Sequence, residues 1–448
     1  MSDLAQYQIS GSTARQIAGS AEAAIREGKL AAGEPLPTMR WLAATLQTSP
    51  ATVHAAYRIL RERGLVVADG RRGTRVARRP AVRSNPRECD RVQGADGLRD
   101  LSIGLPDPEL LPPLGPALAR VDVERSVRVD ELDFAVPELL EFGRGWFEAD
   151  EVDGSAIAVV SGAADGIERV LAAHLRTGDR VLIEDPAYPP IRDILMALGL
   201  IEVPVTIDER GLRPEALAAA LAKDVQALLL IPRAQNPIGA ALDAERAAEL
   251  QLILGHDPEL LVIEDDHASE IAGSPYRSAI GPARRSWAVV RSVSKILHPD
   301  LRLALVAGDQ ETIGRVEGRQ ALGPRWVSHL LQAVAASMLL DPGFAGTCSR
   351  ASEVYAQRRG TLIDALAEHE LPAFGRTGLN IWVPVREEAP IIRVLQEAGW
   401  LALSGERFRI ATSPGVRITV TALSEGEPDE LARTIARGEQ AGRRRRVY

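Results

Sequence analysis

A lysine with serines and an arginine nearby is the part of this chain best suited to covalent chemistry. Lys295 closes the string Ser292-Val293-Ser294-Lys295 after the strand-like run 287–291, and Arg302 follows seven residues later. A lysine at a strand end can form an imine with an aldehyde, while serine hydroxyls and an arginine fork suit a phosphate dianion. Pyridoxal 5'-phosphate carries both groups. The same Ser-x-x-Lys string occurs in penicillin-recognising enzymes, so the string alone does not identify the cofactor.

Two further apolar runs end in polar residues that match the rest of this cofactor. The run 228–231 leads into Asn236-Pro237, and the Asn236 amide can donate to the phenolate oxygen of the pyridoxal ring. The run 260–263 leads into Glu264-Asp265-Asp266-His267. A carboxylate against the pyridine nitrogen keeps that nitrogen protonated, which lets the ring act as an electron sink. We therefore expect the loops after these runs to meet the ring.

Two earlier runs supply candidates for phosphate binding and for stacking. The run 156–160 meets Ser161-Gly162-Ala163-Ala164 and then a helical pattern, which offers a phosphate backbone N–H groups at a helix N-terminus. The run 180–183 leads to Tyr188, whose ring can stack. Taken singly, Asn-Pro is a common turn and Tyr188 an ordinary packing residue. Taken together, each candidate follows an apolar strand, which is where open α/β sheets bind their ligands.

From about Leu101 to Val420, this order of motifs resembles the fold-type I aminotransferases, which are α/β proteins. The resemblance implies that Lys295 is the internal-aldimine lysine, with Asp265 at the pyridine nitrogen and Asn236 at the phenolate oxygen. It implies a cofactor site made of Gly162, Ala163, Ala164, Tyr188, Asn236, Asp265, His267, Ser292, Ser294, Lys295 and Arg302. Arg417 matches the arginine that holds a substrate carboxylate, although its alternation with Val416 and Ile418 also fits a surface strand.

The chain departs from this family at two positions. His267 stands where the family usually has a tyrosine after the nitrogen-binding aspartate. Phe134 stands where the family commonly has a tyrosine that reaches a cofactor phosphate. Neither change prevents imine formation, but both argue against efficient transamination.

Residues 1–80 show the pattern of three short helices followed by a hairpin. The predicted helices run from about Ser12 to Glu27, with Ala14, Ile17, Ala18, Ala21 and Ile25 on one face, from Thr38 onward, and from Ser49-Pro50 to Gly64. Serine before proline is a typical helix start. The turn Gln47-Thr48 is so short that the second and third helices must cross at a sharp angle, as in a helix-turn-helix. The predicted strands are 65–68 and 74–77, and Arg71 and Arg72 lie between them.

Charge separates this segment from the rest of the chain. Residues 1–80 contain twelve basic and six acidic residues, so their net charge is +6 and that of the remainder is −14. A basic domain on an acidic body is typical of a polyanion binder.

Leu36 to Arg40, Thr52-Val53, Gly64 to Val66 and Gly70 to Val76 resemble the winged helix of GntR-family regulators. We therefore predict a DNA-binding surface made of Arg40, Ser49, Thr52, His54, Arg58, Arg71, Arg72 and Gly73. Pro50 stands where the family often has a DNA-contacting arginine, so part of the usual contact set is missing.

A GntR-type winged helix joined to an aminotransferase-like body resembles the MocR subfamily of bacterial transcription regulators. We predict a winged helix at 1–78, a flexible linker at 79–100 and a pyridoxal-phosphate-binding domain at 101–448, with subdomains at about 101–325 and 345–440. The resemblance implies a homodimer that binds promoter DNA and senses the cofactor, an amino compound or both through aldimine exchange at Lys295. The alternative is a working aminotransferase that carries a DNA-binding arm.

The remaining composition limits the class of protein. No run of 18 apolar residues and no signal-peptide pattern is present, so we expect a cytoplasmic protein. Cys89 and Cys348 are far apart, so we expect no disulfide. We also expect no metal, because no Cys/His cluster has ligand spacing.

Overall fold

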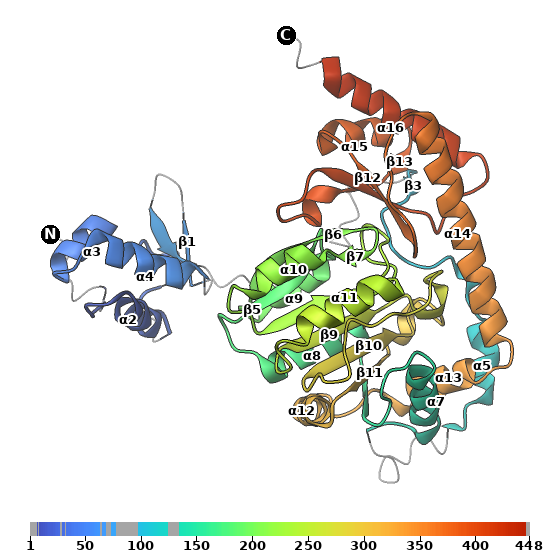
Figure 1. The fold of residues 1–448 in the computed structure, drawn as a ribbon, viewed down its shortest axis with the longest axis horizontal. Coiled ribbons are helices and arrows are strands. Elements are labelled where there is room, and N and C mark those ends of the chain that lie inside the picture. The colour runs from blue at the N-terminus through green and yellow to red at the C-terminus, as the bar shows by residue number, and fades with distance from the viewer. Residues whose placement is uncertain are drawn as a thin grey trace. The chain divides into compact units, whose positions relative to one another are not determined.

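The computed structural model describes residues 7, 9–26, 29–31, 33–62, 65–68, 73–77, 97–123 and 134–444. Arg71 and Arg72, two of the predicted DNA-binding residues, lie outside this set, as do Cys89 and most of the predicted linker. The chain divides into two compact units. The first contains the N-terminal elements, and most of the remaining chain forms the second (Figure 1). None of the described helices is both long and apolar enough to cross a membrane.

The N-terminal unit is a winged helix, as predicted. Its elements are α2 (Ala14–Arg26), α3 (Met39–Thr45), α4 (Pro50–Glu62), β1 (Val66–Ala68) and β2 (Thr74–Val76). β1 and β2 form an antiparallel hairpin. Side-chain caps begin two of the helices: Thr38 Oγ1 accepts from Trp41 N at 3.3 Å, and Ser49 Oγ accepts from Thr52 N at 3.0 Å. The predicted start residues therefore do begin these helices.

The core of the winged helix comes from one face of each helix. Ile17, Val53 and Leu60 are fully buried, and the buried Tyr57 hydroxyl donates to the Pro37 carbonyl oxygen at 2.7 Å. The prediction for the first helix needs one correction. Ile25 is only half-buried, whereas Ala24 is buried, because the buried face follows 17, 21 and 24 around the helix.

An eight-stranded sheet in the order β4-β11-β10-β9-β8-β5-β6-β7 forms the centre of the second unit (Figure 1). Its strands are β4 (Ile157–Val160), β5 (Arg180–Asp185), β6 (Ile201–Asp208), β7 (Gly211–Leu212), β8 (Ala227–Leu230), β9 (Leu261–Asp266), β10 (Trp287–Ser292) and β11 (Ala304–Gly308). β5, β8, β9 and β10 are parallel, and β11 is antiparallel to both β10 and β4. The carboxyl ends of β4, β5, β8, β9 and β10 therefore meet at one edge.

Helices pack around this sheet. They are α5 (Leu114–Arg120), α7 (Pro137–Glu148), α8 (Ala163–His174), α9 (Pro189–Ala197), α10 (Pro214–Leu221), α11 (Ala244–Leu254), α12 (Gln310–Ala321) and α13 (His329–Leu339). Short 3-10 helices η2 (Pro108–Leu110), η3 (Ser269–Ile271), η4 (Pro299–Leu301) and η5 (Gly405–Arg407) join other elements. Every residue of β8 to β11 is buried, as expected for a sheet with both faces covered.

A smaller subdomain follows the central sheet. It contains α14 (Phe344–Glu368), β12 (Asn380–Pro384), α15 (Glu388–Glu397), β13 (Trp400–Leu401), β14 (Leu403–Ser404), β15 (Gly415–Thr419) and α16 (Glu427–Arg444). The predicted linker is wrong at its end, because Arg99 and Asp100 form β3, which pairs in parallel with β13. A two-residue strand has no readable periodicity. Its backbone bond from Arg99 N to Gly399 O, at 2.8 Å, depends on a residue 300 positions away.

A buried ion-pair network joins the carboxyl ends of β8, β9 and β10. The Asp266 carboxylate accepts two hydrogen bonds from Arg233 and one from Arg291, each at 2.8 Å. Burial acts to raise the pKa of Asp266, but the two guanidinium groups outweigh burial and hold that pKa well below its usual range. Arg291, which is fully buried, also donates to the Trp146 carbonyl oxygen at 2.6 Å and pairs with Asp150.

We expect Asp266→Ala to lower the free energy of unfolding by about 3–5 kcal/mol, because it leaves two buried guanidinium groups without their shared carboxylate. The matched control is Glu259→Ala, which removes the solvent-exposed ion pair with Arg285. That change should cost at most about 0.5 kcal/mol. Urea unfolding followed by tryptophan fluorescence measures both, and equal midpoints for the two variants would contradict the role given to Asp266.

Candidate functional site

A cavity of about 300 Å³ lies where the carboxyl ends of the parallel strands meet. Ten predicted cofactor residues line it: Ala163, Ala164, Tyr188, Asn236, Asp265, His267, Ser292, Ser294, Lys295 and Arg302. Its other lining residues were not anticipated: Ile103, Gly104, Leu105, Ile167, Pro190, Ile191, Ile194, Pro299, Leu379 and Asn380. The ten predicted residues, spread over some 140 positions of sequence from 163 to 302, therefore share one site.

Asp265 presents a buried carboxylate to this cavity. The residue is 3% exposed, and its Oδ1 atom has no hydrogen-bond partner among the described residues. Burial, assisted by the charge of Asp266, raises the pKa of Asp265 to about 7, against an opposing effect of Lys295. A buried acceptor without a partner is costly. A protonated pyridine nitrogen would supply the missing donor and would favour the carboxylate form.

Lys295 and His267 lie on the same cavity. The Lys295 ammonium donates to the carbonyl oxygen of Gly104. His267 Nε2 lies 3.1 Å from the Ala234 carbonyl oxygen. Because a carbonyl only accepts, Nε2 carries the proton in this contact. Removal from water, together with the charge of Lys295, lowers the pKa of His267 to about 4, so the ring is neutral at pH 7.

The phosphate candidates gather around the start of α8. Gly162 is the N-cap of α8, with φ +93° and no side-chain cap. A Cβ at this glycine would lie 3.3 Å from Nη2 of Arg302, so the arginine packs directly over it. Ser292 Oγ accepts from Ser294 N at 3.2 Å. A helix N-terminus, hydroxyl groups and an arginine fork form a donor set suited to a phosphate dianion.

Asn236 connects the cavity to Arg417. Asn236 Oδ1 accepts from Arg417 Nη1 at 3.2 Å, which leaves the amide N–H₂ of Asn236 for an acceptor in the cavity. Arg417, on β15, is fully buried, donates to the Ser102 carbonyl oxygen and lies over the Phe408 ring. The described structure therefore places Arg417 behind Asn236, outside the residues that line the cavity. The surface-strand alternative for Arg417 is wrong.

Two positions singled out in the sequence lie apart from the cavity wall. Gly162 supports Arg302 without lining the cavity itself. Phe134 lines a different pocket, together with Leu140 and Val159, and its carbonyl oxygen accepts from Gln332. The segment 103–105 was missed because no local pattern marks it. It reaches the cavity through pairing with residues some 300 positions later.

Those predicted DNA-binding residues that the structure describes lie at the surface of the winged helix. Arg40, Ser49, His54, Arg58 and Gly73 are exposed, and Thr52 is half-buried. The Ser49 and Thr52 hydroxyls lie 2.8 Å apart, so the residue that caps α4 is also bonded to a side chain in the first turn of that helix. His54 and Arg58 lie four positions apart on α4, the second helix of the helix-turn-helix, so they share one face. This is the helix that enters the major groove in such domains.

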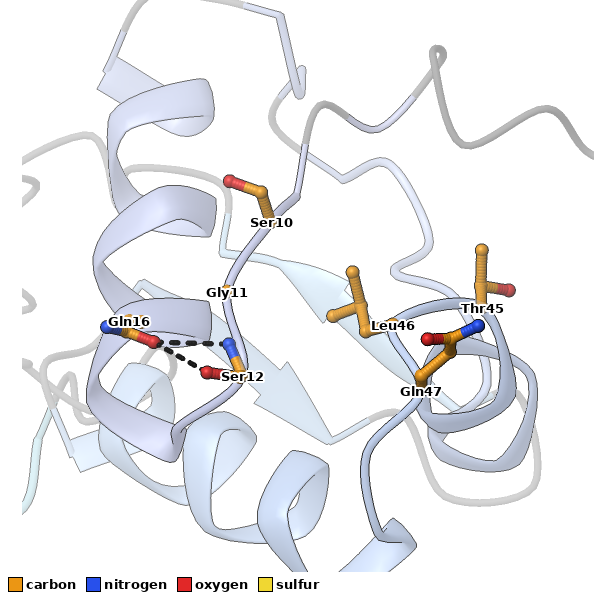
Figure 2. A pocket seen from close by; sticks show the side chains of 7 residues that line it. All are labelled: Ser10, Gly11, Ser12, Gln16, Thr45, Leu46 and Gln47. Atoms are coloured by element: carbon orange, nitrogen blue, oxygen red, sulfur yellow. Dashed lines mark hydrogen bonds between the residues drawn. The ribbon is translucent and has the colours of Figure 1, made fainter.

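A separate pocket lies between the start of α2 and the end of α3 (Figure 2). Its lining residues are Ser10, Gly11, Ser12, Gln16, Thr45, Leu46 and Gln47. Gln16 Oε1 accepts from the backbone N of Ser12 at 3.1 Å and from its Oγ at 3.2 Å (Figure 2). This lining has no charged side chain, and part of its polar surface is satisfied internally.

Comparison with known proteins places both units in families. Residues 144–435 match the model for aminotransferase class I and II, and residues 13–76 match that for bacterial regulatory proteins of the gntR family. The vitamin B6 salvage pathway transcriptional repressor PtsJ of Salmonella typhimurium is 38% identical over 95% of this chain and 98% of its own length. The pyridoxine biosynthesis transcriptional regulator PdxR of Corynebacterium glutamicum is 28% identical over 77% of this chain and 76% of its own length.

The fold is also found among solved structures. A multiple substrate aminotransferase from Thermococcus profundus superposes with a TM-score of 0.71 at 20% identity, covering 81% of this chain and 96% of that one. The chain belongs to the MocR-type regulators, in which a GntR winged helix precedes an aminotransferase-like domain. It is a DNA-binding transcription regulator whose cofactor is pyridoxal 5'-phosphate.

We expect Asp265→Asn to have opposite effects on stability and on cofactor binding. The raised pKa of Asp265 means that its neutral form is favoured on folding, so its contribution to stability is lost as pH rises through about 7. The cofactor-free variant should therefore gain on the order of 2 kcal/mol over wild type between pH 5 and pH 8. Its affinity for pyridoxal 5'-phosphate should fall by about tenfold or more, because the pyridinium loses its anion. Thermal unfolding and absorbance titration test this, and unchanged affinity would refute the pairing.

We expect Arg40→Ala with Arg58→Ala to weaken DNA binding on all sequences. Losing two phosphate contacts should reduce the slope of log affinity against log salt by about 2. Fluorescence anisotropy at several salt concentrations, on promoter and random DNA, provides the measurement. Arg285→Ala, an exposed arginine of the second unit, is the control. Equal losses for control and double variant would show that total charge, and not this surface, sets the affinity.

Proposed function

We propose that the aminotransferase-like domain senses pyridoxal 5'-phosphate, an amino compound or both, and that Lys295 is the switch. The observation that carries the proposal is the placement of Lys295. It lines one cavity with nine of the other cofactor candidates, and it also donates to Gly104 in the chain segment at the start of the body. The printed names of the two regulators above, which concern vitamin B6 salvage and pyridoxine biosynthesis, support a signal of this kind.

When bound, pyridoxal 5'-phosphate supplies an aldehyde carbon that exchanges between amines. Lys295 Nζ is the chain's own amine for that carbon. Asp265 holds a proton at the ring nitrogen, Asn236 donates to the phenolate oxygen, and Tyr188 covers the ring. Arg417 holds a carboxylate where the amino compound has one, at the expense of its bonds to Asn236 and Ser102.

A change at Lys295 would act on the structure through residues 101–107, a segment that we call the strap. Gly104 accepts from Lys295 and Ser102 accepts from Arg417. At the far end, Asp107 accepts from Arg358 at 2.9 Å. With Nζ committed to the aldehyde carbon of a bound cofactor, Lys295 would no longer be the free ammonium that donates to Gly104, so occupancy of the site would change what holds the strap. The strap is preceded in sequence by the residues that connect it to the winged helix, and this connection is the proposed route to DNA binding.

Features of the site favour sensing over rapid turnover. His267, which is neutral at pH 7, replaces a phenol on the cofactor oxygen, and Phe134 has no hydroxyl to offer a phosphate. A catalyst must hold its groups in register with a transition state, whereas a sensor needs only different affinities in two states. The working aminotransferase remains the second hypothesis, supported by the complete set of lysine, aspartate and asparagine.

The same proposal covers the assembly, the location and the domain boundaries. A homodimer on promoter DNA follows from the aminotransferase-like body, and a cytoplasmic location follows from regulation of transcription. The winged helix ends at about residue 78. With Arg99 and Asp100 in β3, the connecting segment ends near residue 98, and the body begins there.

We expect Lys295→Ala to abolish the response of DNA binding to pyridoxal 5'-phosphate while leaving basal affinity near that of wild type. In wild type, the cofactor should shift promoter affinity by about tenfold, a typical coupling between two sites. Lys223→Ala, at an exposed lysine, is the matched control. Anisotropy titrations with and without cofactor measure the promoter affinity of each variant. Borohydride reduction should attach the cofactor covalently to Lys295 in wild type and should attach none at this position in Lys295→Ala.

Two results separate the hypotheses. An identical cofactor response in wild type and Lys295→Ala would overturn the switch. Rapid transamination of an amino acid by wild type, without an effect on promoter binding, would favour the aminotransferase.

A further inference from the structure

Two loops that carry cofactor residues are joined by one buried side chain, that of Gln235. Its Nε2 donates to the Pro186 carbonyl oxygen at 2.9 Å and to Glu184 Oε2 at 3.1 Å. Its Oε1 accepts from Ile238 N at 3.0 Å. Gln235 is 0% exposed and both polar ends of its side chain are engaged. These contacts join the turn after β8 to the last residues of β5, where Glu184 lies, and to the turn that follows it.

These two turns place different groups on the cofactor cavity. Pro186 precedes Tyr188 by two residues in the turn after β5, and Gln235 immediately precedes Asn236 in the turn after β8. Tyr188 and Asn236 both line the cavity. β5 and β8 are paired only from Val181 to Ile183, so beyond the strands the turns need a separate connection.

Glu184 is suited to its part in this connection. It is 4% exposed, and Oε1 has no hydrogen-bond partner among the described residues. Burial, with a contribution from Asp265, raises the pKa of Glu184 to about 8 against the hydrogen bonds from Gln235 and Ile231. At pH 7 it is therefore mostly a neutral acceptor for Gln235, and it adds little negative charge beside Asp265.

We propose that Gln235, held by Glu184, is a positioning residue that sets the placement of Tyr188 relative to Asn236 around the cofactor. The inference rests on the assignment of those two residues to pyridoxal 5'-phosphate. A site is effective when its contacting groups are locked by the shell behind them, because small displacements cost affinity. Gln235 supplies this support for both Tyr188 and Asn236, because its side-chain amide contacts the turn after β5 and the turn after β8.

The test is Gln235→Met, which keeps the length of the side chain and removes its three hydrogen bonds. The matched control is Gln226→Met. Gln226 also bridges β5 and β8, but at their amino ends: its Oε1 accepts from Arg180 N at 2.9 Å, away from the cavity. Both full-length variants are titrated with pyridoxal 5'-phosphate, followed by the absorbance and the visible circular dichroism of the bound cofactor, and their thermal unfolding is recorded.

Gln235→Met should weaken cofactor binding by about tenfold and reduce the visible dichroism at saturation, because the stacking ring and the amide no longer hold one geometry. Borohydride should still fix the cofactor on Lys295. Gln226→Met should bind the cofactor with wild-type affinity, even if its unfolding temperature falls as far as that of Gln235→Met. Wild-type affinity and dichroism in Gln235→Met would overturn the proposal, as would equal losses in both variants.

Variants of Glu184 test the proposal if Gln235→Met does not fold. Glu184→Gln keeps a neutral acceptor and should match wild type, whereas Glu184→Met removes one of the two acceptors and should weaken binding by about threefold. Equal affinities for these two variants would overturn the proposal. These readouts concern the bound cofactor alone. They hold or fail whether or not cofactor alters DNA binding, so a failure of the sensing hypothesis is separately visible.

Discussion

The carboxylate of Asp266, shared between Arg233 and Arg291, is the interaction on which the cofactor site depends. Each of the three residues stands next to a group that the cofactor needs. Arg233 precedes Asn236 in the turn after β8, Asp266 follows Asp265 on β9, and Arg291 precedes the string 292–295 after β10. Three adjacent strands are thus tied together at the ends that carry the site. A charge group so deeply buried is stable only with all its partners present.

The alternation of side chains along β9 separates the ion-pair network from the cofactor cavity. Asp265 and Asp266 are neighbours on β9, so their side chains point to opposite faces of the sheet. One face receives the cofactor cavity, and the other receives the two guanidinium groups. Burial raises the pKa of Asp265, and the charge of Asp266, which those groups hold ionised, raises it further. A structural ion pair on one face therefore tunes a functional carboxylate on the other.

The site is surrounded by contacts that link it to the rest of the body. Gln235 joins the turns behind Tyr188 and Asn236, while Lys295 and Arg417 hold the strap. An enzyme and a sensor can share such a cofactor-binding site, because both must bind the cofactor in one orientation. They differ in what is coupled to occupancy, and here Lys295, the lysine proposed to bond the aldehyde, also donates to Gly104 in the segment that follows the winged helix in sequence.

Local sequence was enough to predict the winged helix, the five strands that lead to the cavity and ten of the residues that line it. Helix periodicity and the caps at Thr38 and Ser49 depend on near neighbours, and most of the cofactor candidates lie within a few residues of the end of an apolar run. Only the tertiary structure decided the partners of Asp266, the strap and the bridge through Gln235. Arg291 looked like the end of a strand until β9 and β10 were paired, and β3 became visible only through β13. These contacts join residues tens to hundreds of positions apart, and no local periodicity encodes such pairings.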